Sequence, residues 1–210
     1  MKKTFLPLLF IIAVLLTSCS QLVRITYKDG KYIDSTHNIQ YENASVSYEP
    51  VSEGTEYARY NKTVLYTIPG AEPTEWLAEK YEGIGSVFYS DDAVLPALSE
   101  FEAVKILIFV SGFNSLAVAS INDADVIAEL TDIIANGEQT EAKNTDDSYS
   151  LKIASDKYPF LYYNLVYIIS SDGERYVYDR GTKRTVAVGT LLDKYFTGDP
   201  AHIEPENDTE

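Results

Sequence analysis

Apolar and polar residues alternate along much of this chain, a pattern that predicts short β-strands. Residues 23–27 and 31–33 alternate in this way on either side of Asp29-Gly30. An Asp-Gly pair between alternating runs indicates a hairpin, because a type I′ turn requires positive φ at both central residues. Ser171-Asp172-Gly173-Glu174 predicts a second hairpin, between strands over 160–169 and 175–178. Further strands are predicted over 39–41, 46–48, 63–68, 86–89, 104–110, 116–121, 149–154 and 184–188.

One longer segment has helical spacing instead. The apolar residues that would share one face of this helix are Val126, Ile127, Leu130, Ile133 and Ile134. Asn122 can cap the helix, and Asp123 and Asp125 would complement its N-terminal dipole. Gly137 is suited to end it. We therefore expect the main helix over about 122–136.

Two shorter helices are predicted near 73–81 and 190–196. Pro73 suits a first helical turn, where its missing N–H costs nothing. Thr190, with Asp193 three residues later, resembles a capping box. Together the pattern predicts an α+β fold with a mostly antiparallel sheet and helices on one face.

The N-terminal segment has the organisation of an export signal. Lys2-Lys3 precede a run of twelve mainly apolar residues, 5–16, and the run leads into Leu16-Thr17-Ser18-Cys19. A helix that spans a bilayer needs about 20 apolar residues, so this run is too short and is typical of a signal-peptide h-region. Cys19 is the only cysteine of the chain, so a mature protein lipidated there would have neither a disulfide nor a free thiol.

These residues resemble the signal peptide and lipobox of bacterial lipoproteins. The lipobox is formed by Leu16, Thr17, Ser18 and Cys19. The resemblance implies cleavage after residue 18 and attachment of acyl chains such as palmitate to the Cys19 thiol. Because two or more acyl chains hold a protein stably on a bilayer, we expect a membrane-anchored protein on the extracytoplasmic face, which is the cell surface in a Gram-positive host. The alternative is an ordinary secretory signal in which Cys19 has no role.

The remaining chain divides into three parts. We expect a β-rich subdomain over 19–100, an α+β subdomain over 101–196 and a disordered acidic tail over 197–210. The acidic, tyrosine-rich body with this layout is similar to small uncharacterised lipoproteins of Gram-positive bacteria, especially anaerobic Firmicutes. That resemblance implies no active site.

Charge narrows the possible partners. The chain has 17 basic and 32 acidic residues and a formal net charge of −15, and losing Lys2 and Lys3 with the leader would change it to −17. Nucleic acid is excluded as a partner, because its phosphates need lysine and arginine. The charge also argues against lying flat on anionic lipid. Solubility and mutual repulsion explain the acidity best, with capture of a basic partner or of divalent cations as the alternative.

The sequence offers few catalytic groups. His202 lies in the acidic tail, and His37 lies in a polar loop with no nucleophile elbow to accompany it. Two carboxylates could hydrolyse glycans, but no acid lies within an apolar run of a predicted strand. Asp91-Asp92, Asp146-Asp147 and Asp123 with Asp125 could bind calcium, yet none matches a known calcium loop. We therefore assign no catalytic residue, no metal site and no cofactor.

Aromatic content is the remaining signal, with 17 tyrosines, eight phenylalanines and one tryptophan. Five tyrosines lie on two adjacent predicted strands: Tyr162, Tyr163, Tyr167, Tyr176 and Tyr178. Cross-strand tyrosines could form a platform for sugar rings or for a protein partner. The alternative is that tyrosine is simply a good strand former.

Three functions are compatible with these features. The first is a non-catalytic module that binds a surface protein or a glycan. The second is a carboxylate-dependent hydrolase of cell-wall or environmental glycans. The third is a structural or assembly lipoprotein of an envelope complex.

Overall fold

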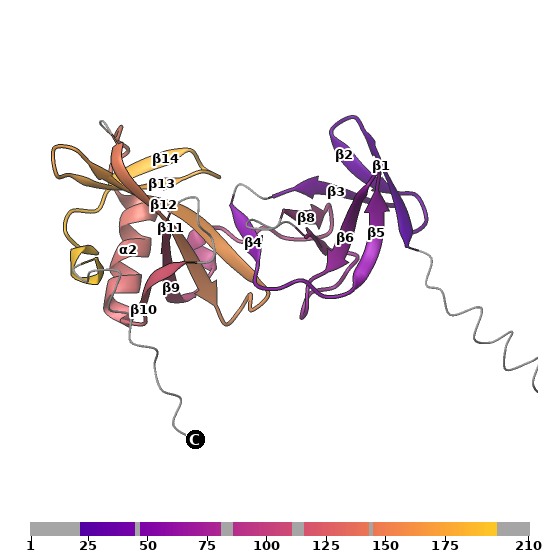
Figure 1. Cartoon of the computed structure of the whole chain (residues 1–210), viewed down its shortest axis with the longest axis horizontal. Coiled ribbons are helices and arrows are strands. Elements are labelled where there is room, and N and C mark those ends of the chain that lie inside the picture. Colours follow the sequence, from indigo (N-terminus) through magenta and orange to yellow (C-terminus); the bar gives the residue numbers. More distant parts are fainter. Residues whose placement is uncertain (1–21, 45–46, 81–85, 111–115, 143–144, 197–210) are drawn as a thin grey trace, which may run out of the picture.

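The computed structural model describes residues 22–44, 47–80, 86–110, 116–142 and 145–196. The leader, the lipobox and the acidic tail lie outside these ranges. The described chain forms two β-structures side by side, a barrel from the N-terminal half and a sheet from the C-terminal half (Figure 1). The protein is mostly β with a single α-helix, so the coarse α+β expectation holds, but a closed barrel replaces part of the expected open antiparallel sheet.

The barrel has seven strands in the order β1-β2-β3-β8-β7-β6-β5. The strands are β1 (Val23–Lys28), β2 (Lys31–Asp34), β3 (Ile39–Asn43), β5 (Glu56–Tyr60), β6 (Thr63–Thr67), β7 (Trp76–Glu79) and β8 (Val87–Ser90). All neighbours are antiparallel except β1 and β5, whose parallel pairing closes the barrel. The Asp29-Gly30 hairpin is confirmed, with φ of 53° and 86° at the two turn residues.

The helix predicted over 73–81 is wrong, because the described part of this segment turns at residues 73–75 and then continues as β7. Trp76, Leu77 and Ala78 are all buried, and their side chains alternate between two cores. Leu77 belongs to the barrel interior, whereas Trp76 and Ala78 belong to the larger core shared with the second sheet. The sequence of a strand that is buried on both faces is a continuous apolar run. Hydrophobic periodicity alone does not distinguish such a strand from a short buried helix.

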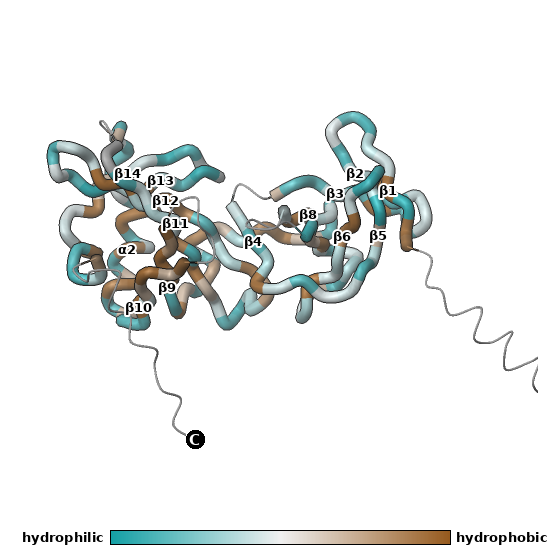
Figure 2. Tube along the Cα trace, viewed as in Figure 1, coloured by the Kyte–Doolittle hydropathy of each residue, from teal (hydrophilic) through white to brown (hydrophobic). Residues whose placement is uncertain are grey.

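The second sheet has the order β10-β9-β11-β12-β13-β14, with β4 paired to the start of β12. Its strands are β4 (Tyr48–Pro50), β9 (Ala103–Val110), β10 (Ala117–Ile121), β11 (Thr145–Ser155), β12 (Leu161–Ser170), β13 (Arg175–Asp179) and β14 (Arg184–Ala187). Every pairing within it is antiparallel. Its central strands carry much of the apolar sequence, as the brown colouring of β9 in Figure 2 shows. The 3₁₀ turn η1 (Leu98–Glu100) precedes β9.

The main helix, α2 (Ala124–Asn136), packs on one face of this sheet against β9. Its N-cap is Asp123 and not Asn122, because the Asp123 carboxylate accepts hydrogen bonds from the backbone N–H groups of Asp125 and Val126. Gly137 ends the helix as predicted. The Arg184 guanidinium adds a second cap, since it donates to three carbonyls at this end, the nearest at 2.8 Å.

The helix predicted over 190–196 is replaced by a short 3₁₀ turn, η2 (Asp193–Tyr195), whose N-cap is Leu192 and not Thr190. The Asp193 carboxylate does not form a capping box. It accepts hydrogen bonds from Arg175 Nε at 3.0 Å and from the Tyr167 hydroxyl at 3.3 Å. A tertiary ion pair has therefore displaced the local capping interaction.

Candidate functional site

The five tyrosines proposed as one platform lie on two opposite faces of the second sheet. Tyr163 and Tyr167 face α2 and are only 4% and 0% exposed. Tyr162, Tyr176 and Tyr178 lie on the other face, as the register of β12 with β13 requires. Three of the five therefore share a surface, and Tyr176 is itself buried there.

Tyr163 and Tyr167 are core residues. The Tyr163 hydroxyl donates to Asp179 Oδ2 at 2.8 Å, within the buried interior. Burial raises the pKa of both phenols, and the neighbouring carboxylates, Asp179 for Tyr163 and Asp193 for Tyr167, raise it further. These two side chains stabilise the fold and are not available to a ligand.

The face without α2, which we call the open face, is built from alternate residues of five adjacent strands. Its members are Leu107, Phe109, Ser150, Lys152, Tyr162, Asn164, Val166, Ile168, Tyr176, Tyr178 and Thr185. Most of them are half-buried, so aromatic and aliphatic side chains stand side by side at the surface. Such a mixture of Tyr, Phe and aliphatic residues is typical of the centre of a binding surface.

A buried ion pair crosses the open face. Lys152 Nζ on β11 lies 2.8 Å from Glu49 Oε2 on β4, although β12 separates the two strands. The two residues are 8% and 5% exposed, and the ammonium also lies 4.5 Å from the ring centroid of Phe109. A pair this deeply buried depends on having both partners, because either charge alone would be left without compensation. It fixes β4 to the sheet.

His37 lies in an exposed loop between β2 and β3, as expected from sequence, and a buried carboxylate holds its imidazole. Asp34 is 0% exposed and accepts hydrogen bonds from the backbone N–H groups of Thr36 at 2.8 Å and His37 at 3.1 Å. Its Oδ2 also lies 2.7 Å from His37 Nδ1, and the imidazole stacks near Tyr57. The Asp-x-x-His spacing that permits this turn is visible in the sequence. Within the described ranges Asp34 is the only hydrogen-bond partner of His37.

Among the described residues three carboxylates are buried, each just beyond the end of a strand predicted from sequence, and none lies within an apolar run. Asp34 ends β2, Glu49 lies on β4 and Asp179 ends β13, and all three are at most 5% exposed. Each is engaged within the fold: Asp34 by the His37 turn, Glu49 by Lys152, and Asp179 by Tyr163 and by the backbone N–H of Gly181 at 2.8 Å. These contacts give all three carboxylates structural roles.

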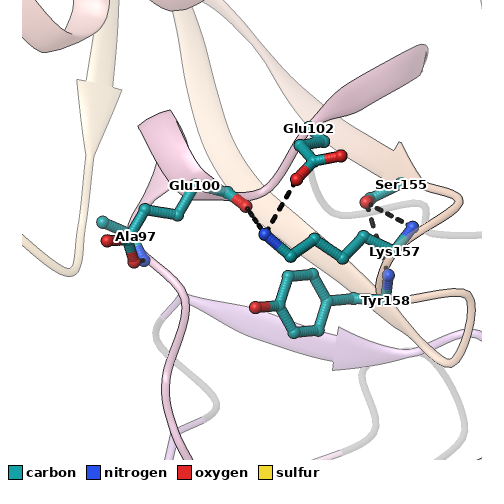
Figure 3. Close-up of polar contacts among 6 residues, drawn as sticks. All are labelled: Ala97, Glu100, Glu102, Ser155, Lys157 and Tyr158. Carbon is teal, nitrogen blue, oxygen red and sulfur yellow. Dashed lines mark hydrogen bonds and ion pairs between the residues drawn. The ribbon is translucent and has the colours of Figure 1, made fainter.

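A polar cluster joins the β11–β12 turn to the start of β9 (Figure 3). Lys157 Nζ donates to Glu102 Oε1 at 2.8 Å and to the Glu100 carbonyl at 3.3 Å. The Ser155 hydroxyl oxygen accepts hydrogen bonds from the backbone N–H groups of Lys157 and Tyr158. A groove of about 510 Å³ lies beside it, between α2 and the start of β9. Its lining is mainly alanine and aliphatic, and it includes the carboxylates of Glu102 and Asp132. Glu102 is paired with Lys157, and Asp132 accepts a hydrogen bond from the Asn136 amide at 2.8 Å, so both carboxylates are engaged by neighbouring side chains.

Of the acidic pairs considered as calcium ligands, one member each of the Asp91-Asp92 and Asp123/Asp125 pairs is engaged within the fold, and the side chain of Asp146 lies outside the described residues. Asp91 accepts a hydrogen bond from Lys31 at 2.9 Å, and Asp123 caps α2. In the part of the chain that the structure describes, His, Cys, Asp and Glu side chains form no group of three or more that could hold a metal ion.

Comparisons of the chain with protein-family models, with curated proteins and with solved structures found no match. Among the described residues, no helix is long and apolar enough to cross a bilayer.

Breaking the Lys152–Glu49 pair from one side should destabilise the protein strongly. For Glu49→Gln we expect the free energy of unfolding to fall by about 3–5 kcal/mol, because the Lys152 ammonium stays buried without its counter-charge. The matched double variant Glu49→Gln with Lys152→Met removes both charges and should recover most of that loss. Urea denaturation of the three proteins measures this, and equal losses in the single and double variants would contradict it.

Stability should fall at alkaline pH. The folded pKa of Tyr163 and Tyr167 is raised above the usual value of 10.0, so the unfolded chain releases these protons first. Stability is unaffected while both states hold the proton, and it decreases as the pH rises past about 10. Denaturation midpoints measured across this range, together with phenolate absorbance, test the prediction. Full ionisation of every tyrosine near pH 10 with the fold intact would contradict it.

Proposed function

We propose that this chain is a lipid-anchored extracytoplasmic protein whose second sheet is a non-catalytic binding module for a surface protein or a glycan. The observation that carries the proposal is the open face, where Phe109, Val166, Ile168 and Tyr178 stand half-exposed in neighbouring rows. Aromatic side chains offer large contact area at low conformational-entropy cost, which suits them to recognition.

The chemistry of the described side chains favours binding over hydrolysis. A glycosidase needs two carboxyl groups that face one substrate across about 5–10 Å. Here the three buried carboxylates are engaged within the fold. Glu49 pairs with Lys152, Asp179 accepts a hydrogen bond from Tyr163, and Asp34 binds the His37 turn. A structural role in an envelope complex would use the same open face and differs only in the identity of the partner.

The anchor rests on Leu16-Thr17-Ser18-Cys19, and it is tested by Cys19→Ala. We expect this variant to leave the membrane fraction or to accumulate as the unprocessed precursor, because the thiol that would carry the acyl chains is gone. Ser18→Ala, which keeps a small residue before the cysteine, serves as the control and should fractionate normally. Membrane association and processing of Cys19→Ala that match the wild type would overturn the anchor.

The binding module is tested by placing a charge on the open face. We expect Val166→Glu to reduce partner capture at least tenfold in crosslinked intact cells, since an uncompensated carboxylate at the centre of an interface costs several kcal/mol. Val94→Glu, at a side chain that is 74% exposed in a loop, is the matched control and should capture normally.

If no protein is captured, the mature chain should be screened against cell-wall glycans with the same two variants. Turnover of a glycan or peptide that is lost on changing one carboxylate would overturn a non-catalytic role. Equal losses in Val166→Glu and Val94→Glu would show that the open face is not the binding site.

A further inference from the structure

A second surface lies on the barrel, where the parallel strands β1 and β5 meet. The groove there has a volume of about 690 Å³. It is lined by Leu22, Arg24, Ile25, Thr26, Tyr27, Arg59, Tyr60 and Asn61. None of these eight residues is acidic, although acids outnumber bases almost two to one in the whole chain.

Two arginines stand side by side in this groove. The parallel register pairs Arg24 with Arg59 directly, and both side chains are exposed. Within the described ranges neither guanidinium has a hydrogen bond or an ion pair to the protein, while Lys31, Lys152, Lys157, Arg175 and Lys194 all pair with carboxylates. Like charges directly opposite one another destabilise a strand pair, and an anion bound between the two guanidinium groups would offset that cost.

The side chains of the groove include several hydrogen-bond donors that could bind an anion carrying several oxygen atoms. A guanidinium presents a planar fork of donors that matches phosphate or carboxylate oxygens in pairs. Thr26 and Asn61 add a hydroxyl and an amide, which are neutral donors. Two guanidinium groups and two neutral donors together suit a phosphate, which offers more oxygens than a carboxylate does.

The position of the groove in the chain indicates where this phosphate comes from. Arg24 lies five residues after Cys19. Five residues span at most about 18 Å even when fully extended, so an acylated Cys19 would hold β1 within reach of the lipid headgroups. Figure 1 shows β1 and β5 at the end of the molecule away from the second sheet, so this contact would leave the open face directed elsewhere.

We propose that Arg24 and Arg59 bind the phosphate groups of anionic phospholipid headgroups and thereby orient the barrel on the membrane. This proposal rests on the lipid anchor proposed above. The net charge of −15 opposes general adsorption to an anionic surface, which is why the contact is confined to one acid-free groove. Thr26 and Asn61 position the headgroup.

The test is an NMR titration of the mature chain, residues 19–210, with Cys19→Ser to prevent oxidation. The probes are phosphatidylcholine bicelles with and without phosphatidylglycerol, and soluble glycerol 3-phosphate. We expect the side-chain Nε–H signals of Arg24 and Arg59 to shift saturably with phosphatidylglycerol. Each of Arg24→Gln and Arg59→Gln should weaken the response of the remaining arginine about fivefold. Arg180→Gln, at an exposed arginine in the turn between β13 and β14, is the matched control and should change nothing.

Each outcome decides the proposal. Saturable shifts confined to the two arginines support it. A response to glycerol 3-phosphate without one to phosphatidylglycerol bicelles overturns the membrane as the source of the phosphate, and no shift, or an equal shift at Arg180, overturns the site itself. Because the titration uses a chain without acyl groups, its failure is distinguishable from failure of the anchor, which the fractionation of Cys19→Ala reports separately.

Discussion

The two halves of the molecule depend on β4, a three-residue strand that leaves the barrel sequence between β3 and β5 and joins β12 of the second sheet. Its first residue, Tyr48, packs edge-on between Trp76 of the barrel and Tyr163 of the sheet, with ring centroids 6.5 Å and 5.3 Å away. The Tyr48 hydroxyl donates to the Pro96 carbonyl, and the next residue, Glu49, forms the buried pair with Lys152. One short strand therefore contacts the barrel through Tyr48 and is held to the second sheet by Glu49, beside the direct contact of Trp76 with Phe160 at 5.8 Å.

This connection explains which elements the sequence predicts well. Both Asp-Gly hairpins and the main helix are determined by neighbours within a few residues, and the structure has all three. Strand β7 is different, because its two faces belong to two cores built from residues far apart in the sequence. Strand β5 was not predicted at all, since its sequence Glu-Tyr-Ala-Arg-Tyr contains a single side chain that is fully buried. Tertiary context decides such segments, and local propensity does not.

The candidate sites were also hard to predict, because their residues come together only in the tertiary structure. Glu49 and Lys152 are about a hundred residues apart in the sequence, and Arg24 and Arg59 are brought together only by barrel closure. The tyrosines of β12 and β13 were identified as a group, but strand alternation placed two of them in the core. Only the His37 turn lies within four consecutive residues, so it alone was open to prediction from a local pattern.

The parallel pairing of β1 with β5, which closes the barrel, determines the position of the two arginines in the groove. In β1 and β5, Ile25 and Ala58 are buried inside the barrel, and Arg24 and Arg59, their neighbours in the chain, must therefore point outward. A slip of one residue in either strand would turn its arginine into the apolar interior and its apolar residue out to water, which is a large cost. The core residues thus fix the register, and the register places Arg24 and Arg59 next to each other on the outer face. The repulsion between two exposed guanidinium groups costs less free energy than exposing Ile25 and Ala58 would, so the barrel keeps the two arginines together without a ligand. The anion proposed above would reduce that repulsion further.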